Sequence, residues 1–139
     1  MFKKILVPVD IDQEASVSSL ATAGDLAKKY GASLTLINVQ ATVPAMVTSY
    51  LPEGFPKEND RIVAARLQAL AGEYKLGANT GVVVRHGNAH HEILAFAEDN
   101  GIDLILIASH HPGLSDYLLG STAGHVVRHA QCSVLVLRL

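Results

Sequence analysis

The sequence predicts an α/β fold in which helices cover both faces of a single open, doubly wound, parallel five-stranded sheet. Short apolar runs alternate with segments of helical periodicity along the whole chain. Each helical segment is long enough to carry the chain back, so that consecutive strands run parallel with right-handed crossovers. The 139 residues contain no repeat, low-complexity tract or change of composition, which predicts one domain over residues 1–139.

The first half of the chain is predicted to form two strands, at residues 3–9 and 33–39, and two helices, at 14–30 and 58–74. Gly31 is a typical residue for the end of the first helix. Residues 41–56 contain three prolines, one glycine and no periodicity, which predicts a long exposed loop. The apolar faces of the two helices are expected to consist of Val17, Leu20, Ala21 and Ala27, and of Ile62, Ala65, Leu67, Leu70 and Ala71.

The second half is predicted to form three strands, at residues 81–85, 103–108 and 132–139. A helix is expected at 89–100, followed by a glycine stop, and another helix begins at Gly120-Ser121-Thr122. The residues expected to face inward are Ile93, Leu94 and Ala97 in the first of these helices, and Ala123, Val126, Val127 and Ala130 in the second.

Composition excludes several classes of function. A formal charge of −2 and 17% charged residues give no support to binding of nucleic acid or of a membrane surface. The apolar runs are too short to span a membrane, and no signal peptide is recognised. The single Cys132 cannot form an internal disulfide, and we expect it to be a small core thiol in a buried strand. These features suit the reducing cytoplasm.

Candidate ligand-binding residues follow two of the predicted strands. Asp10 comes directly after the first strand, and Ser109-His110 come directly after the fourth. Ligands of open α/β sheets bind at the carboxyl ends of strands, where the strand order reverses. If the first and fourth strands are neighbours at that point, these residues and the helix start at Gly120 surround one crevice. A Gly-Ser-Thr helix start leaves backbone N–H groups unpaired and is suited to a phosphate. Purely structural alternatives stay open, because Asp10 is also a common helix cap and such turns are common in themselves.

Known catalytic and metal-binding motifs are missing from the sequence. It contains no GxxxxGK[ST], no GxGxxG after the first strand and no GxSxG, and Cys132 lies away from the expected crevice. His125 and His129 have a spacing that metal ligands use, but no Cys, Asp or Glu is near them in that helix. We therefore predict no catalytic residues and no metal site.

Four segments, KKILVPVD, HGNAHHEIL, DLILIASHH and LLGSTAGHVVRHAQCSVLVLRL, together resemble the universal stress protein family. The resemblance implies a small cytoplasmic α/β protein, usually a homodimer, and many members bind ATP or AMP. The family's nucleotide motif is G-x2-G-x9-G-[ST]. Here Ala108 and His111 stand at the first two glycines, and the spacer before Gly120 is one residue shorter. The form ASH-x-PG-x3-YLLGS resembles a branch in which the second glycine is replaced, commonly by arginine, and part of that branch binds nucleotide.

The resemblance also implies roles for individual residues. Asp10 would accept a hydrogen bond from the adenine amino group, and the backbone of Val39 would pair with the edge of the base. Pro8 and Val9 would form the floor of the pocket, with Ile107 and Ala108 beside the ribose. The phosphates would face Ser109, His110, His111, Gly113, Gly120, Ser121 and Thr122, with Mg²⁺ accompanying ATP.

The function expected from these observations is a stress-response protein that binds an adenine nucleotide, ATP or AMP, as a regulatory or protective module. A homodimer is expected through the final strand, because residues 133–139 are apolar almost throughout and are expected to lie at a sheet edge. Two alternatives stay open. One is a dimeric interaction protein whose nucleotide site has decayed, and the other is a slow ATPase or self-phosphorylating enzyme.

Overall fold

The computed structural model describes residues 1–109 and 119–139, which contain a five-stranded sheet in the order β3-β2-β1-β4-β5. All neighbouring strands are parallel. The order reverses between β1 and β4, so the first and fourth strands are neighbours at the reversal point, as the crevice hypothesis requires. The strands are β1 (Lys4–Pro8), β2 (Ser33–Gln40), β3 (Gly81–His86), β4 (Leu104–Ser109) and β5 (Ser133–Arg138).

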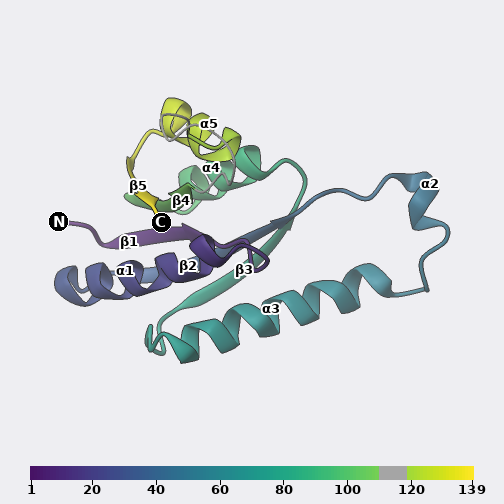
Figure 1. Cartoon of the computed structure of the whole chain (residues 1–139), viewed down its shortest axis with the longest axis horizontal. Helices are drawn as coiled ribbons and strands as arrows, with labels where there is room; N and C mark the ends of the chain where they lie inside the picture. Colours follow the sequence, from purple (N-terminus) through teal and green to yellow (C-terminus); the bar gives the residue numbers. More distant parts are fainter. Residues whose placement is uncertain (110–118) are drawn as a thin grey trace.

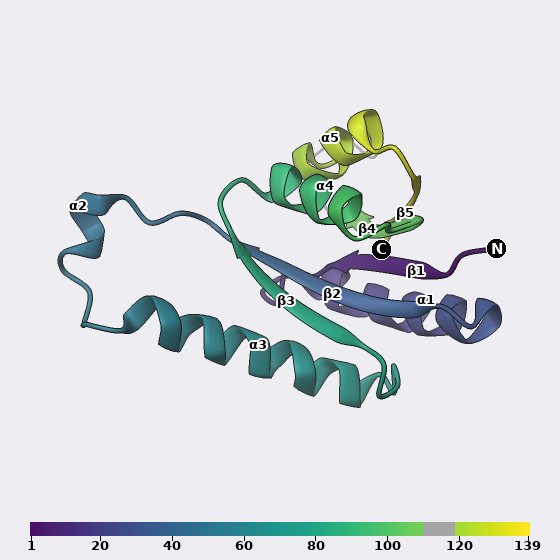
Figure 2. The same ribbon diagram turned by 180° about the vertical axis from the view of Figure 1, so that it is seen from behind.

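Helices cover both faces of the sheet, which confirms the predicted fold class. Figures 1 and 2 show α1 and α3 on one side of the strands and α4 and α5 on the other. The helices are α1 (Glu14–Tyr30), α2 (Ala45–Thr48), α3 (Phe55–Glu73), α4 (Ala89–Asp99) and α5 (Ser121–His129).

The sheet separates two hydrophobic cores, and β1 contributes to both. Ile5 and Val7 pack toward α1 and α3, where they join Leu20 and Leu67. Leu6 points to the opposite face and joins the core beneath α4 and α5. Side chains alternate between faces along a strand, so a strand buried on both faces is apolar without interruption. The run IleLeuVal in β1 is therefore the signature of a central strand.

A carboxylate joins the start of β1 to the start of β4. The side chain of Asp103 accepts hydrogen bonds from the backbone N–H of Lys3, at 2.8 Å, and of Lys4, at 3.1 Å. The Asp103 N–H donates to the carbonyl oxygen of Lys4 at 3.0 Å. These contacts fix the position of β1 relative to β4 at the end of the sheet opposite the predicted crevice.

Parts of the predicted helix faces were wrong. In α3, Leu67 and Leu70 are buried as expected, but Ile62 is 58% exposed and Ala65 is exposed, while Val63 is buried. The amino-terminal part of α3 extends past the sheet (Figure 1), so its apolar side chains have less surface to pack against. Two further residues expected to face inward are also exposed, Ala21 in α1 and Val127 in α5. A helix that lies on a sheet buries only a narrow stripe of its surface. Alanine also occurs on the exposed side of a helix, because it has a high helix propensity.

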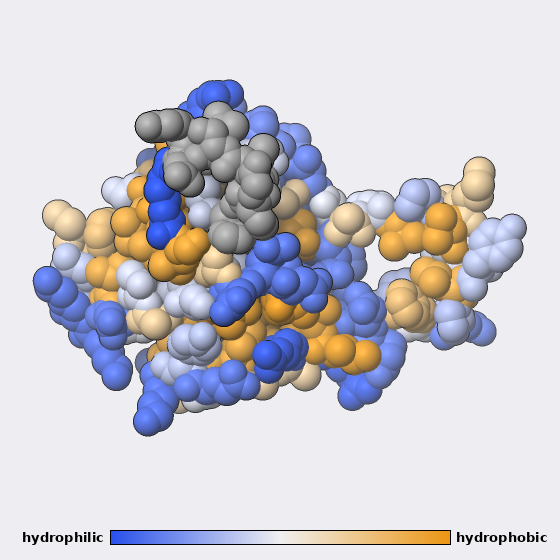
Figure 3. All heavy atoms as spheres, viewed as in Figure 1, coloured by the Kyte–Doolittle hydropathy of each residue, from blue (hydrophilic) through white to orange (hydrophobic). Residues whose placement is uncertain are grey.

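Residues 41–50 are all exposed, as predicted for a long loop. They form an arm that projects from the body of the molecule (Figure 1) and contains the short helix α2, which the sequence did not predict. The side chains of Val43, Met46 and Val47 give the arm an apolar surface, visible in Figure 3.

Cys132 lies just before β5 and is half-buried, so its predicted place within a buried strand was wrong. In the described sheet β5 is the last strand and pairs with β4, and its residues are half-buried or exposed. Partial burial raises the pKa of the Cys132 thiol, which keeps it protonated and unreactive near neutral pH. In the described part of the chain, no helix has the length and apolar character that crossing a membrane requires.

Candidate functional site

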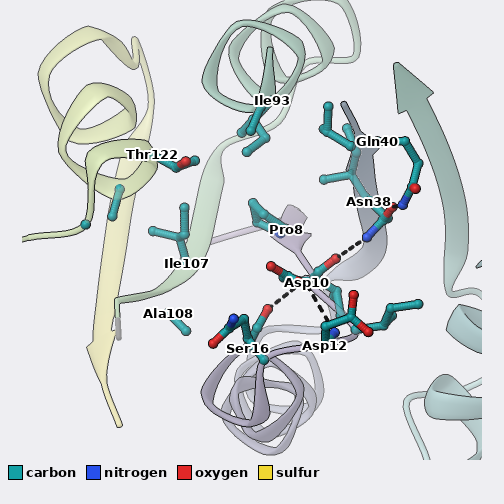
Figure 4. A pocket seen from close by; sticks show the side chains of 18 of the residues that line it. Pro8, Asp10, Asp12, Ser16, Asn38, Gln40, Ile93, Ile107, Ala108 and Thr122 are labelled. Carbon is teal, nitrogen blue, oxygen red and sulfur yellow. Dashed lines mark hydrogen bonds between the residues drawn. The ribbon is translucent and has the colours of Figure 1, made fainter. Parts of the chain in front are cut away.

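A cleft of about 730 Å³ lies at the carboxyl ends of β1, β2 and β4, between the first turns of α1 and α5 (Figure 4). Its volume is in the range of small-molecule sites. It is located where the strand order reverses, which is the expected place for a ligand in this architecture.

Most of the predicted site residues lie together in this cleft. The ones that line it are Pro8, Val9, Asp10, Val39, Ile107, Ala108, Gly120, Ser121 and Thr122. Ser109 does not line it, but its Oγ accepts a hydrogen bond from the Gly120 N–H at 3.2 Å and so supports one wall. His110, His111 and Gly113 lie outside the described residues, and their roles stay predictions.

Asp10 forms a turn at one end of the cleft. Its backbone N–H donates to Ser16 Oγ at 2.7 Å, and its Oδ1 accepts from the Asp12 N–H at 3.1 Å. The side chain of Asp10 therefore closes a turn two residues long and is not the cap of α1, whose N-cap is Gln13. Asp10 is exposed, and its Oδ2 has no hydrogen-bond partner among the described residues. One carboxylate oxygen is thus available to accept a hydrogen bond from a ligand.

Two amide side chains beside Asp10 were not recognised in the sequence. Asn38 is only 5% exposed, and its Nδ2 donates to the Val9 carbonyl oxygen at 2.8 Å. Its Oδ1 accepts from Nε2 of Gln40, and both contacts are visible in Figure 4. The one signal for this pair was a polar residue within the apolar run LeuIleAsnVal, because a buried amide requires partners.

The amino terminus of α5 forms the opposite end of the cleft. Its N-cap is Gly120, which offers no side-chain cap, and the first helical hydrogen bond runs from the Gly124 N–H to the Gly120 carbonyl oxygen at 2.8 Å. The N–H groups of Ser121, Thr122 and Ala123 therefore precede the helical ladder. These groups, together with the helix dipole, favour an anion at this end.

The two ends of the cleft differ in electrostatic character, with carboxylates at one end and the start of α5 at the other. None of the described residues that line it is Lys, Arg or His, whereas Asp10 and Asp12 place two carboxylates at one end. A ligand with an amino group at the Asp10 end and negative charge at the α5 end fits this arrangement. The described lining also contains no cationic side chain to neutralise a phosphate during its transfer.

A group of histidines lies next to the α5 end, where α4 and α5 meet. The rings of His90 and His125 stack with centroids 4.1 Å apart and planes 12° apart. The His125 Nδ1 donates to the Ser121 carbonyl oxygen at 2.7 Å, a choice of tautomer that the carbonyl acceptor dictates. Partial burial, followed by the charges of His125, His91 and His129, lowers the pKa of His90. Within the described ranges, no group of three His, Cys, Asp or Glu side chains could hold a metal ion.

Comparisons with known proteins agree with this architecture. The model of the universal stress protein family matches residues 1–138. The chain is 31% identical over 149 aligned residues to universal stress protein YxiE of Bacillus subtilis, in an alignment that covers 99% of this chain and 100% of that protein. Among solved structures, universal stress protein UspA from Lactobacillus plantarum has a TM-score of 0.75 and 28% identity, covering 99% of this chain and 98% of that one. A universal stress protein in complex with cAMP shares the fold, with a TM-score of 0.71, 21% identity and coverage of 99% and 97%.

Proposed function

Because this chain belongs to the universal stress protein family, we propose that it binds an adenine nucleotide, AMP or ATP, in the cleft between Asp10 and the start of α5. The observation that carries the proposal is that one cleft at the strand reversal contains both a carboxylate oxygen available to a ligand and the unpaired backbone N–H groups at the start of α5. A structure of a family member in complex with cAMP is consistent with this choice of ligand.

The base would occupy the end formed by β1 and β2. Oδ2 of Asp10 would accept a hydrogen bond from the exocyclic amino group of adenine, a donor that guanine replaces with a carbonyl oxygen. Pro8 and Ile107 would pack against the faces of the base and ribose, since both line the cleft. A carboxylate beside an amino group favours adenine, whereas the same carboxylate would repel the carbonyl oxygen of guanine.

The phosphates would occupy the α5 end. Backbone N–H groups of Ser121 and Thr122 would donate to phosphate oxygens, and the hydroxyl groups of both residues would add further donors. Because the described lining has no lysine or arginine, we propose binding without hydrolysis as the main activity, with Mg²⁺ accompanying ATP when ATP is the ligand.

We propose that this nucleotide-binding domain covers residues 1–139, acts in the cytoplasm and forms a homodimer through β5. The support for the dimer is the position of β5 at the end of the described sheet, where it pairs with β4 on one side. In this proposal the nucleotide-binding protein itself acts in the stress response as a regulatory or protective module.

The test is to identify any ligand retained by the purified protein by mass spectrometry, followed by calorimetric titration with AMP, ATP and GTP. We expect AMP and ATP to bind more tightly than GTP, and the substitution Asp10→Ala to reduce this difference. If neither adenine nucleotide binds at millimolar concentration, the interaction protein with a decayed site becomes the better description.

A further inference from the structure

The hydrogen bonding between β1 and β2 changes at the edge of the cleft. The Val9 N–H donates to the Ile37 carbonyl oxygen at 2.8 Å, so Ile37 directs its peptide groups toward β1. On the other side of β2, the Gly87 N–H donates to the Gln40 carbonyl oxygen at 2.9 Å, so Gln40 directs its groups toward β3. Successive residues of a strand alternate in this direction. Val39, two residues after Ile37, therefore directs its N–H and C=O toward the side of β1.

Continuation of the ladder would bring the Val39 N–H to the Val9 carbonyl oxygen. That oxygen instead accepts from Asn38 Nδ2 at 2.8 Å. β1 ends at Pro8, opposite Ile37, and no hydrogen bond joins Val39 to Val9 or to the residues after it in the described structure. The Asn38 side chain thus replaces the backbone as the partner of Val9.

The orientation of the Asn38 amide is determined by its two partners. A carbonyl oxygen can only accept, so the nitrogen of Asn38 must face Val9 and its oxygen must face Gln40. Gln40 Nε2 donates to that oxygen, and Figure 4 shows the two amides in line beside the cleft. Asn38 is 5% exposed, so this arrangement is held in the interior.

We propose that Asn38 is a positioning residue of the adenine site, which ends the β1–β2 ladder and leaves the backbone N–H and C=O of Val39 open to the base. The inference rests on the proposed function. Adenine presents the acceptor N1 beside the donor amino group, and these match an N–H and a C=O. Guanine presents a donor at N1 beside an acceptor oxygen, which opposes both groups of Val39. Asn38 therefore contributes to base selectivity without contacting the base.

A structural role for Asn38 alone would have a different consequence. A buried amide needs hydrogen-bond partners in any protein, and its loss would lower stability equally with or without ligand. The positioning role predicts in addition that the hydrogen bonding of the Val39 N–H, and therefore its protection from exchange, depends on Asn38.

The first experiment measures amide hydrogen exchange by NMR in the wild-type protein, with Ile37 as the internal reference for a strand amide. We expect the Val39 amide to exchange much faster than that of Ile37 in the free protein, and to become protected when AMP is added. A Val39 amide that is already as protected as Ile37 without ligand would overturn the inference and leave the proposed function intact. Failure of AMP and ATP to bind at all would instead refute the proposed function, and this inference with it.

The second experiment compares Asn38→Leu with Thr35→Val, a polar-to-apolar substitution in the same strand away from the cleft. In Asn38→Leu the Val9 oxygen is released, so Val39 should become protected without ligand, and the ratio of AMP to GMP affinity should fall about tenfold, as for loss of a hydrogen bond. Thr35→Val should keep the fast exchange of the Val39 amide in the free protein and the wild-type ratio of AMP to GMP affinity. An Asn38→Leu protein that folds and keeps its selectivity within about twofold would contradict the positioning role. If Asn38→Leu does not fold, the exchange measurement on the wild type decides.

Discussion

Replacement of Gly120 by valine tests whether the α5 end of the cleft holds a phosphate. Gly120 is buried and has φ −58° and ψ 155°, a conformation that any L-residue adopts, so valine introduces no backbone strain. Because Gly120 lines the cleft and directly precedes Ser121, we expect the valine side chain to reach the space beside the N–H groups of Ser121 and Thr122. We expect Gly120→Val to exclude the phosphate by occupying that space.

The size of the effect follows from the groups that would be lost. Three N–H groups precede the helical ladder of α5, and a hydrogen bond to a charged partner contributes about 1.5–3 kcal/mol net. If the phosphate gains the net equivalent of one such bond, AMP binds about 10- to 150-fold more tightly than adenosine. In Gly120→Val this ratio should fall to about one, with the affinity for adenosine nearly unchanged, since the base end is not altered.

The assay is calorimetric titration of AMP and adenosine into both proteins. The matched control is Gly124→Ala in the same helix, where an added Cβ meets nothing within 4 Å. This control should keep the wild-type ratio and stabilise α5 by up to about 1 kcal/mol, because alanine favours a helix more than glycine does. If the ratio of AMP to adenosine affinity is the same in Gly120→Val as in the wild type, the placement of the phosphate is refuted.

Three further predictions concern the dimer, the histidines and metal binding. Val136→Lys puts a charge at a half-buried position in the middle of the edge strand β5, and sedimentation velocity should then show monomers or aggregates. A wild-type monomer at micromolar concentration would contradict the dimer. The pKa of His90 is lowered in the fold, so below pH about 6.5 the unfolded chain binds more protons than the folded one. The melting temperature should therefore fall from pH 7.5 to 5.5, and less so in His90→Gln; an equal fall in both proteins would exclude His90 as a cause. Metal analysis of untagged protein should find no stoichiometric zinc, and one zinc per chain that disappears in His129→Ala would show the opposite.

The elements that could be predicted from the sequence are those whose signal is local. Strands such as β1 and β4 are uninterrupted apolar runs because they are buried on both faces, and glycine marks the end of α1 at Gly31, which has a φ of 65°. The sequence predicted one crevice on condition that the first and fourth strands are neighbours at the reversal point, and the strand order meets that condition.

The parts that the sequence did not predict depend on residues distant along the chain. Asn38 is explained by the carbonyl oxygen of Val9, 29 residues earlier, and nothing in the apolar run around it indicates that partner. The stacking of His90 on His125 requires α4 and α5 to be adjacent, which periodicity within either helix cannot reveal. Ile62 was misplaced because periodicity says which residues share a face but not where the sheet beneath that face ends.

The central place of β1 has a consequence for biosynthesis. During synthesis β1 emerges before the other four strands. β2 can pair with one side of β1 as soon as α1 and β2 have been synthesised. The other side pairs with β4 and is joined to it by Asp103, which is 100 residues after Lys3. At ordinary rates of translation, about 5–20 residues per second, one apolar edge of β1 stays open for several seconds. Nascent chains in that interval are the ones that need protection from association through open edges. The cleft also requires α5, so a nucleotide bound there as we propose would stabilise only chains that have passed this stage.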